Sequence, residues 1–350
     1  MKTEGVLPRE LGYSFPPEFD PHEATWLSWP HKEASWPGKI NSIYPAYARF
    51  ISELLKSEKV RINVNHAEMR KQAETILRNE KVDPEQVEFY LHPTNDAWCR
   101  DHGPAFLVNP RADQPKVIVD WGYNAWGNKY PPYDLDDVVP SLIAKHFHLP
   151  VFHPGIVMEG GSVEFNGKGT ILTSKSCLLN PNRNPHLSQE QIEQYLRDYY
   201  GTEQILWVSD GIVGDDTDGH IDDTVRFVNS HTLLTAVETR KSDENYSILK
   251  KNLAELRKMR LLDGRQPDIC ELPMPDPVIW EDQRLPASYA NFYIANKSVI
   301  VPVFRCKNDE LALRIIQDCF PERNICPIDS TDLIWGLGSF HCLSQQEPLL

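Results

Sequence analysis

Ser162-Val-Glu-Phe-Asn166, followed by Thr170-Ile-Leu172, joins two short apolar runs through a turn that contains asparagine and glycine. Such an order predicts a β-hairpin. The same order recurs at Ala105-Phe-Leu-Val-Asn109 with Val117-Ile-Val119, Thr224-Val-Arg-Phe-Val-Asn229 with Thr232-Leu-Leu234, and Asn291-Phe-Tyr-Ile-Ala-Asn296 with Val299-Ile-Val301. Repetition of one unit along a chain indicates a fold that is built from equivalent modules.

Stretches with helical periodicity separate the hairpins. They cover residues 44–56, 67–78, 136–146, 188–200, 243–262 and 309–320. Ser188 and Gln191 have capping-box spacing, and Gly201 follows as a helix stop. Alternation of hairpins and helices predicts an α/β fold.

Polar residues stand just before the hairpins at a common interval. Asp96, Glu159, His220 and Cys342 are separated by 63, 61 and 122 residues. The last interval is about twice the others, and residues 25–37 lie roughly one interval before Asp96, so that the first and last segments can complete one module. Five ββα-type modules around an axis would bring these polar residues together. No linker-like tract divides the copies, which predicts a single domain over 1–350.

Composition limits the partners that the protein can bind and indicates where in the cell it is located. The formal net charge of −14, from 36 basic and 50 acidic residues, opposes binding to nucleic acid. We expect no membrane span and no signal peptide, and therefore a cytoplasmic protein. Its seven cysteines lack C-x-x-C spacing, which argues against a disulfide framework or a zinc knuckle.

Cys342, His220, Glu159, Asp96 and Asp222 together supply a thiol nucleophile, an acid/base and three carboxylates. A cysteine beside histidine is typical of covalent catalysis. Additional carboxylates match a planar guanidinium, which donates hydrogen bonds in a fixed fork. The residues therefore predict a cationic substrate.

Each of these residues also has an ordinary structural interpretation. Cys342 could be a small core side chain, His220 could brace a turn, and Asp96 could join an ion-pair network with Arg100 and Asp101. A structural role is harder to assign to Glu159, because a glutamate that precedes two glycines contributes little to the stability of a fold. A metal site made of His220, Asp222 and either Asp96 or Glu159 is the other functional interpretation, although no H-x-H or H-E-x-x-H spacing supports it.

Six segments resemble those of agmatine deiminases, a family related to bacterial-type peptidylarginine deiminases. They are Thr94-Asn-Asp-Ala-Trp-Cys-Arg-Asp-His-Gly-Pro104, Asn124-Ala-Trp-Gly127 with Tyr130-Pro-Pro-Tyr-Asp-Leu-Asp-Asp137, Met158-Glu-Gly-Gly161, Asn180-Pro-Asn-Arg-Asn-Pro185, Thr217-Asp-Gly-His-Ile-Asp222 and His341-Cys-Leu-Ser-Gln-Gln346. Leu337, Ser339 and Asn128 depart from the usual pattern. The resemblance implies a pentein fold, a five-bladed α/β propeller with pseudo-fivefold symmetry.

The resemblance also implies roles for individual residues. Cys342 would be the nucleophile, His220 the general acid/base and Glu159 its carboxylate partner, while Asp96 and Asp222 would grip the guanidinium. Agmatine would yield N-carbamoylputrescine and ammonia through a covalent thiouronium, with no metal or organic cofactor. Variants of Cys99, Cys177 and Cys319 are expected to keep activity.

Loop residues bear on the choice of substrate. The loop 121–137 is rich in aromatic and acidic side chains, and Trp126 in that loop and Asp216 before His220 are expected to hold the distal ammonium of agmatine. Asp136 and Asp137 are expected to be ordinary surface residues or helix caps. This loop and residues 270–286 are long enough to be lids.

Rival interpretations are an arginine or peptidylarginine deiminase, an amidinotransferase and a non-catalytic pentein binding module; a homo-oligomer would fit any of them.

Overall fold

In the computed structural model, which describes residues 5–350, the predicted hairpins are confirmed as the first two strands of four similar sheets. In each, the hairpin is antiparallel and a third strand joins its second strand in parallel. The sheets are β4 (Ala105–Val108), β5 (Lys116–Val119) and β6 (Val151–Phe152); β7 (Val163–Phe165), β8 (Thr170–Ser174) and β9 (Gln204–Val208); β10 (Val225–Phe227), β11 (Thr232–Val237) and β12 (Asp268–Pro273); and β15 (Tyr293–Ile294), β16 (Ser298–Val303) and β17 (Asn324–Asp329).

A further sheet repeats the pattern with strands from both ends of the chain. It contains β18 (Ser344–Pro348), β1 (His22–Ser28), β2 (Lys59–Asn63) and β3 (Val87–Tyr90). Strand β1 is antiparallel to β18 and parallel to β2. The first and last segments therefore lie in one sheet, as the spacing of the polar residues predicted.

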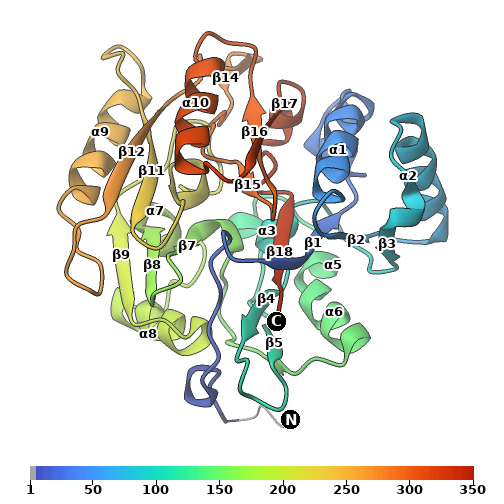
Figure 1. The fold of residues 1–350 in the computed structure, drawn as a ribbon, viewed down its shortest axis with the longest axis horizontal. Helices are drawn as coiled ribbons and strands as arrows, with labels where there is room; N and C mark the ends of the chain where they lie inside the picture. The colour runs from blue at the N-terminus through green and yellow to red at the C-terminus, as the bar shows by residue number, and fades with distance from the viewer. Residues whose placement is uncertain (1–4) are drawn as a thin grey trace.

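Helices connect the parallel strands and lie around the outside of the molecule (Figure 1). They are α1 (Ile40–Leu54), α2 (Ala67–Asn79), α6 (Val139–Phe147), α8 (Gln189–Tyr200), α9 (Asn245–Leu256) and α10 (Asp309–Cys319). The capping box of Ser188 and Gln191 is present, and Gly201 ends α8 in the left-handed region with φ 66°. No helix within 5–350 combines the length and apolar character that crossing a membrane requires.

Two helix predictions were wrong in their bounds. The helix expected over 243–262 ends at Leu256, because residues 261–265 form a turn that Leu261 and Arg265 close through their backbones. The helix expected over 136–146 is divided into α5 (Asp134–Asp137) and α6, with Pro140 in the first turn of α6.

Short helical turns and one small hairpin occupy the remaining connections. The turns are η1 (Arg9–Leu11), η2 (Glu33–Ser35), η3 (Pro84–Gln86), α3 (Cys99–His102), α4 (Ala125–Asn128), η4 (Gly160–Ser162), α7 (Lys175–Leu178), η5 (Ile221–Asp223) and η6 (Leu333–Gly336). The hairpin pairs β13 (Ile279–Trp280) with β14 (Gln283–Arg284). Three of the turns, α3, η4 and η5, lie just before the first strand of a sheet and carry the polar residues identified above or lie directly after them.

Helix α8 illustrates how the outer helices are held. Ile192, Leu196 and Tyr200 recur every four residues, so they lie on one face, and all three are buried. They pack in one cluster with Ile171 of β8 and Ile205 of β9. Truncating a buried Leu or Ile to Ala in such a cluster costs about 2–5 kcal/mol.

Candidate active site

The candidate catalytic side chains come from equivalent loops, each of which leads into the first strand of a sheet. Cys342 precedes β18, Asp101 precedes β4, Glu159 precedes β7, and His220 precedes β10. Asn291 precedes β15 and completes the set. The loops thus bring together residues that are hundreds of positions apart in the chain.

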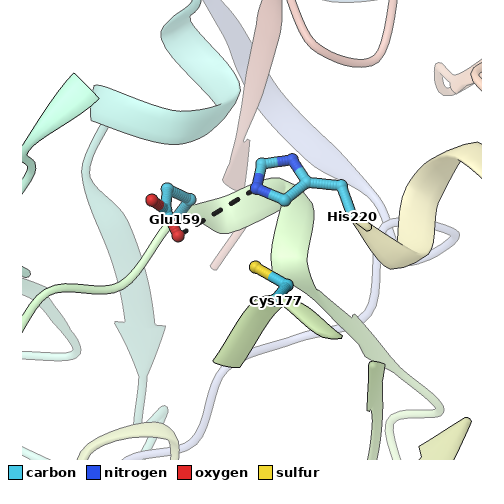
Figure 2. Close-up of side chains that lie close together, drawn as sticks. All are labelled: Glu159, Cys177 and His220. Carbon is cyan, nitrogen blue, oxygen red and sulfur yellow. Dashed lines mark ion pairs between the residues drawn. The ribbon is translucent and has the colours of Figure 1, made fainter. Parts of the chain in front are cut away.

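His220 is buried between carboxylates that do not touch it. Its Nδ1 atom lies 3.8 Å from Asp101 Oδ1, and its Nε2 atom lies 4.0 Å from Glu159 Oε2. Figure 2 shows the latter pair with the thiol of Cys177 beside the ring. Neither ring nitrogen has a hydrogen-bond partner within the described part of the chain. Burial lowers the pKa of His220, but Asp101 first, then Cys177 and Asp222, outweigh it and raise that pKa well above its ordinary value.

The close approach of the Glu159 loop to His220 explains the two glycines that follow Glu159. A Cβ atom on Gly160 would lie 2.1 Å from the carbonyl oxygen of Arg100. One on Gly161 would lie 2.6 Å from His220 Nδ1. A side chain at position 161 would push the Glu159 loop away from His220, and one at position 160 would push it away from the backbone of Arg100.

Cys342 is 7% exposed and opens on a pocket. The side-chain amide of Asn291 donates a hydrogen bond to Sγ over 3.0 Å, and Asp222 Oδ2 lies 3.8 Å from the same sulfur. Burial raises the pKa of the Cys342 thiol well above its ordinary value, and Asp222, Asp223 and Asp101 raise it further. Both effects favour the protonated thiol over the thiolate.

Asp222 is held by one oxygen and leaves the other unpartnered. Its Oδ2 atom lies 2.5 Å from Nδ1 of His341, whose Nε2 atom lies 2.7 Å from Glu18. Its Oδ1 atom is buried and has no partner between residues 5 and 350. Burial raises the pKa of Asp222, but His341 and then His220 outweigh it and hold the pKa below its ordinary value. An ionised carboxylate with a free oxygen is thus available to a cation.

Asp96 and Asp101 occupy different surroundings although they are five residues apart. Asp96 accepts a hydrogen bond from Ser35 Oγ over 2.6 Å and pairs with Lys32 at 3.3 Å. Asp101 accepts hydrogen bonds from Trp126 Nε1 (3.0 Å) and the Gly161 amide (2.9 Å). Burial raises the pKa of Asp101 to about 6 despite the opposing effect of His220. Asp101 rather than Asp96 is therefore the aspartate of this segment that raises the pKa of both His220 and Cys342.

Sequence reasoning did not select Asp101, Asn291, His341 or Arg183 for the site. Arg183 donates to Glu159 Oε1 over 2.6 Å and fixes that carboxylate from behind. Asp101 and Arg183 lie inside segments that carried the family resemblance, so those segments contained the signal. Asn291 opens one of the repeated hairpins, at the position where the other modules carry a catalytic candidate.

The pocket above Cys342 has a volume of about 280 Å³, and aromatic and acidic side chains are prominent in its lining. Trp126 and Asp216 both line it, together with Asp96, Asp101, Trp98, Tyr130, Trp280 and Trp335. The carboxylate of Asp216 accepts a hydrogen bond from Tyr130. Both long loops contribute residues to the walls. Asp136 and Asp137, expected to be helix caps, instead accept hydrogen bonds from the backbone amides of Asn95 and Tyr123.

Within residues 5–350, two groups of side chains could hold a metal ion. They are Glu159, Cys177 and His220, and Asp222, Asp223 and Cys342, with the ligand atoms of each group within 4.8 Å of one another. Each group shares residues with the cysteine–histidine arrangement, so a metal would compete with covalent chemistry there.

Comparisons with known proteins agree with this arrangement. Residues 14–348 match the sequence profile of the Porphyromonas-type peptidyl-arginine deiminase family. A Legionella pneumophila protein named "Putative agmatine deiminase" is 38% identical over 98% of this chain and 97% of its own. The structure of the agmatine deiminase of Enterococcus faecalis superposes with a TM-score of 0.91 at 32% identity, covering 99% of this chain and 98% of that one.

More distant structures show the fold alone. An amidinotransferase from Microseira wollei is similar with a TM-score of 0.54 at 14% identity, over 95% of this chain and 96% of that one. The mixed α/β fold is thus shared beyond deiminases. The full-length match to the family and to its solved structures shows that this chain belongs to the Porphyromonas-type peptidyl-arginine deiminase family.

Proposed function

We propose that this protein is an agmatine deiminase, which hydrolyses agmatine to N-carbamoylputrescine and ammonia through a covalent intermediate on Cys342. The observation that carries the proposal is the position of Cys342 and His220 between buried carboxylates, of which Asp222 has a free oxygen. Such an arrangement suits a guanidinium, and full-length relatives carry the name of this activity.

In the proposed mechanism, the substrate guanidinium lies between Asp101 and Asp222. We assign the inner contact with the guanidinium to Asp101 because Asp96 is neutralised by Lys32, whereas the hydrogen-bond partners of Asp101 carry no charge. The substrate cation neutralises the acids that disfavour the Cys342 thiolate, and the thiol proton is released to solvent through the pocket. Binding of the correct cation thereby activates the nucleophile.

The thiolate then forms a bond to the central guanidinium carbon, and the resulting tetrahedral adduct takes a proton from His220. Ammonia leaves with the electrons of the broken carbon–nitrogen bond, and a thiouronium remains on Cys342. Neutral His220 next removes a proton from water, whose oxygen adds to the same carbon. Breakage of the carbon–sulfur bond releases the ureido product and regenerates the thiolate.

The charge that keeps His220 protonated comes chiefly from Asp101 in this proposal. Asp101 is the strongest of the groups that raise the pKa of His220. Glu159 has one oxygen committed to Arg183 and the other 4.0 Å from the ring. Glu159 thus orients the imidazole from a distance, without forming a close ion pair with it.

We also propose that the sheets are the blades of one five-bladed pentein propeller with pseudo-fivefold symmetry, forming one domain over 1–350. Its support is the shared strand pattern of the sheets and the pairing of β1 with β18. The equivalent loops would then meet at one end of the pseudo-fivefold axis.

The deciding experiment compares kcat/KM for agmatine, arginine and a blocked arginine peptide, without any amine acceptor. Agmatine is expected to be preferred, because the one cation among the described pocket-lining residues, Lys32, is neutralised by Asp96. A preference for arginine or the peptide would overturn the agmatine assignment, and a requirement for an amine acceptor would indicate an amidinotransferase. Full activity after dialysis against a chelator is expected; loss that a divalent ion restores would favour a metallohydrolase.

A further inference from the structure

The segment Asn180–Pro185 lies outside the pocket yet contacts loops that form it. Arg183, from this segment, is 4% exposed. Its Nε atom donates to Glu159 Oε1 over 2.6 Å, and its Nη2 atom donates to the carbonyl oxygen of Thr217 over 2.7 Å. Its Nη1 atom pairs with Asp218 at 2.5 Å. One guanidinium thus joins Glu159 to the loop that carries His220.

Neighbours of Arg183 extend these connections. Asn184 accepts a hydrogen bond from the Val157 amide (2.9 Å) and donates one to the Val157 carbonyl (2.8 Å), two residues before Glu159. The side-chain amide of Asn182 donates to Asp218 over 2.8 Å. The backbone carbonyl of Asn182 accepts a hydrogen bond from the side chain of Asn124, at the start of the Trp126 loop. Three loops of the site are therefore attached to one segment, in which Arg183 and Asn184 are buried.

Arg183 binds only one of the two carboxylate oxygens of Glu159. Oε1 is bonded to Arg183, whereas Oε2 is buried, faces His220 Nε2 at 4.0 Å and has no hydrogen-bond partner among residues 5–350. We propose that Arg183 is a positioning residue: it holds the carboxylate of Glu159 so that one oxygen faces His220 at a distance without closing on it. This inference rests on the proposed roles of Glu159 and His220.

The separation matters because His220 must both give and take a proton. Charged and titratable groups surround the imidazole on the elements packed against it: Asp101 on α3, Glu159, Cys177 on α7, Asp215, Asp216, and Asp222 and Asp223 on η5. Without Arg183, Glu159 loses its counter-cation and moves onto the imidazolium. His220 would then release its proton less readily, which slows the step that expels ammonia more than the step that activates water.

Arg183→Met and Arg183→Lys, with Arg61→Met as control, test the inference. Arg61 is also buried and paired with two glutamates, Glu88 and Glu347, but belongs to β2 and does not line the pocket. Its loss measures the general cost of breaking a buried ion pair. Arg183→Lys keeps the charge, but an ammonium cannot contact Glu159, Thr217 and Asp218 with the geometry of the guanidinium fork.

In Arg183→Met we expect kcat to fall by about thirtyfold or more while KM stays within about threefold, as for loss of an interaction used in chemistry rather than binding. The thiouronium on Cys342 should not accumulate above its wild-type level in acid-quenched samples analysed by intact-protein mass spectrometry, because its formation is the step that is slowed. Arg183→Lys should retain more of kcat, and Arg61→Met should keep kcat once melting curves correct for folded protein.

A substrate-free measurement separates this inference from the proposed function. Nitrogen-15 NMR of the histidine side chains, with His220 identified by its absence in His220→Gln, should give an ionisation midpoint about one pH unit or more higher in Arg183→Met than in wild type. An unchanged midpoint, with a kcat loss no larger than that of Arg61→Met, would overturn the role. If Arg183→Met does not fold, Arg183→Gln carries the same comparison.

Discussion

The floor and the mouth of the pocket contain the same types of side chain in opposite states. By the floor we mean the buried acid and base groups of the site, of which Asp222 and His220 do not themselves line the pocket; both present buried polar atoms that have no partner within the described chain. At the mouth, Asp96 is paired with Lys32 and Asp216 accepts a hydrogen bond from Tyr130. The floor is therefore organised for a cation that the protein itself does not supply, whereas the acids of the mouth are largely satisfied.

This difference indicates where binding energy is used. An unpartnered buried carboxylate is costly, and a substrate that pairs with it recovers that cost at the reacting group. A carboxylate that already has a partner contributes less binding energy, because a charge that is already paired gains little from one further cation. Substitutions at the floor should consequently affect turnover far more than substitutions at the mouth.

Cys342→Ala should show the largest effect, with turnover of agmatine abolished. The expected reason is that no other side chain supplies the attacking atom, and the measurement is ammonia release over hours. The melting temperature should change little, since Cys342 lines the pocket and its sulfur contributes hydrogen bonds only to Asn291 and Asp222 among the described residues. Activity close to wild type in this variant would eliminate the covalent mechanism.

The two aspartates of one segment allow the sharpest comparison of floor and mouth. We expect Asp101→Asn to lower kcat/KM by about a thousandfold, because a charge that stabilises both the substrate and His220 is lost. Asp96→Asn should lower it by about tenfold or less. Steady-state kinetics with agmatine measure both, and a larger loss for Asp96→Asn would return the inner grip to Asp96.

The pH dependence of kcat/KM should report the same carboxylate. The pKa of Asp101 is raised to about 6, so Asp101 is protonated below that pH and its grip on the cation is lost. Because kcat/KM reflects groups of the free enzyme, it should fall as pH decreases through about 6. This acid limb should disappear or move in Asp101→Asn. An identical limb in that variant would assign it to another group.

Much of this arrangement was predictable from repetition. The hairpins at Ser162 and Thr224 revealed the modules, and the interval between Glu159 and His220 placed both in equivalent loops. The interval could not distinguish Asp96 from Asp101, since both lie in the loop before β4 and only the packing of Trp126 and Gly161 against Asp101 separates them. Side-chain contacts across modules leave no periodic trace in a sequence.

Cys177 is a second case in which packing determines the expectation. The sequence predicted that Cys177 and Cys319 variants would both keep activity, but Cys177 lies beside His220 and contributes to raising its pKa (Figure 2). We now expect Cys177→Ala to lower kcat by about tenfold, in line with loss of one interaction to a charged group. Cys319→Ala, on α10, serves as the control and should match wild type.

The smallest effect is expected at the mouth, for Asp216→Asn. The carboxylate of Asp216 lies in the pocket wall but already accepts a hydrogen bond from Tyr130, so its contribution to the distal ammonium of agmatine is that of a partly satisfied charge. KM for agmatine should rise about two- to fivefold with kcat unchanged. Butylguanidine, which has the same guanidinium but no distal ammonium, is the matched control, and its KM should not change. If both substrates lose the same factor, Asp216 shapes the pocket without contacting the ammonium. If kcat falls for agmatine alone, the mouth takes part in orienting the guanidinium for attack, and the separation of floor and mouth would not hold.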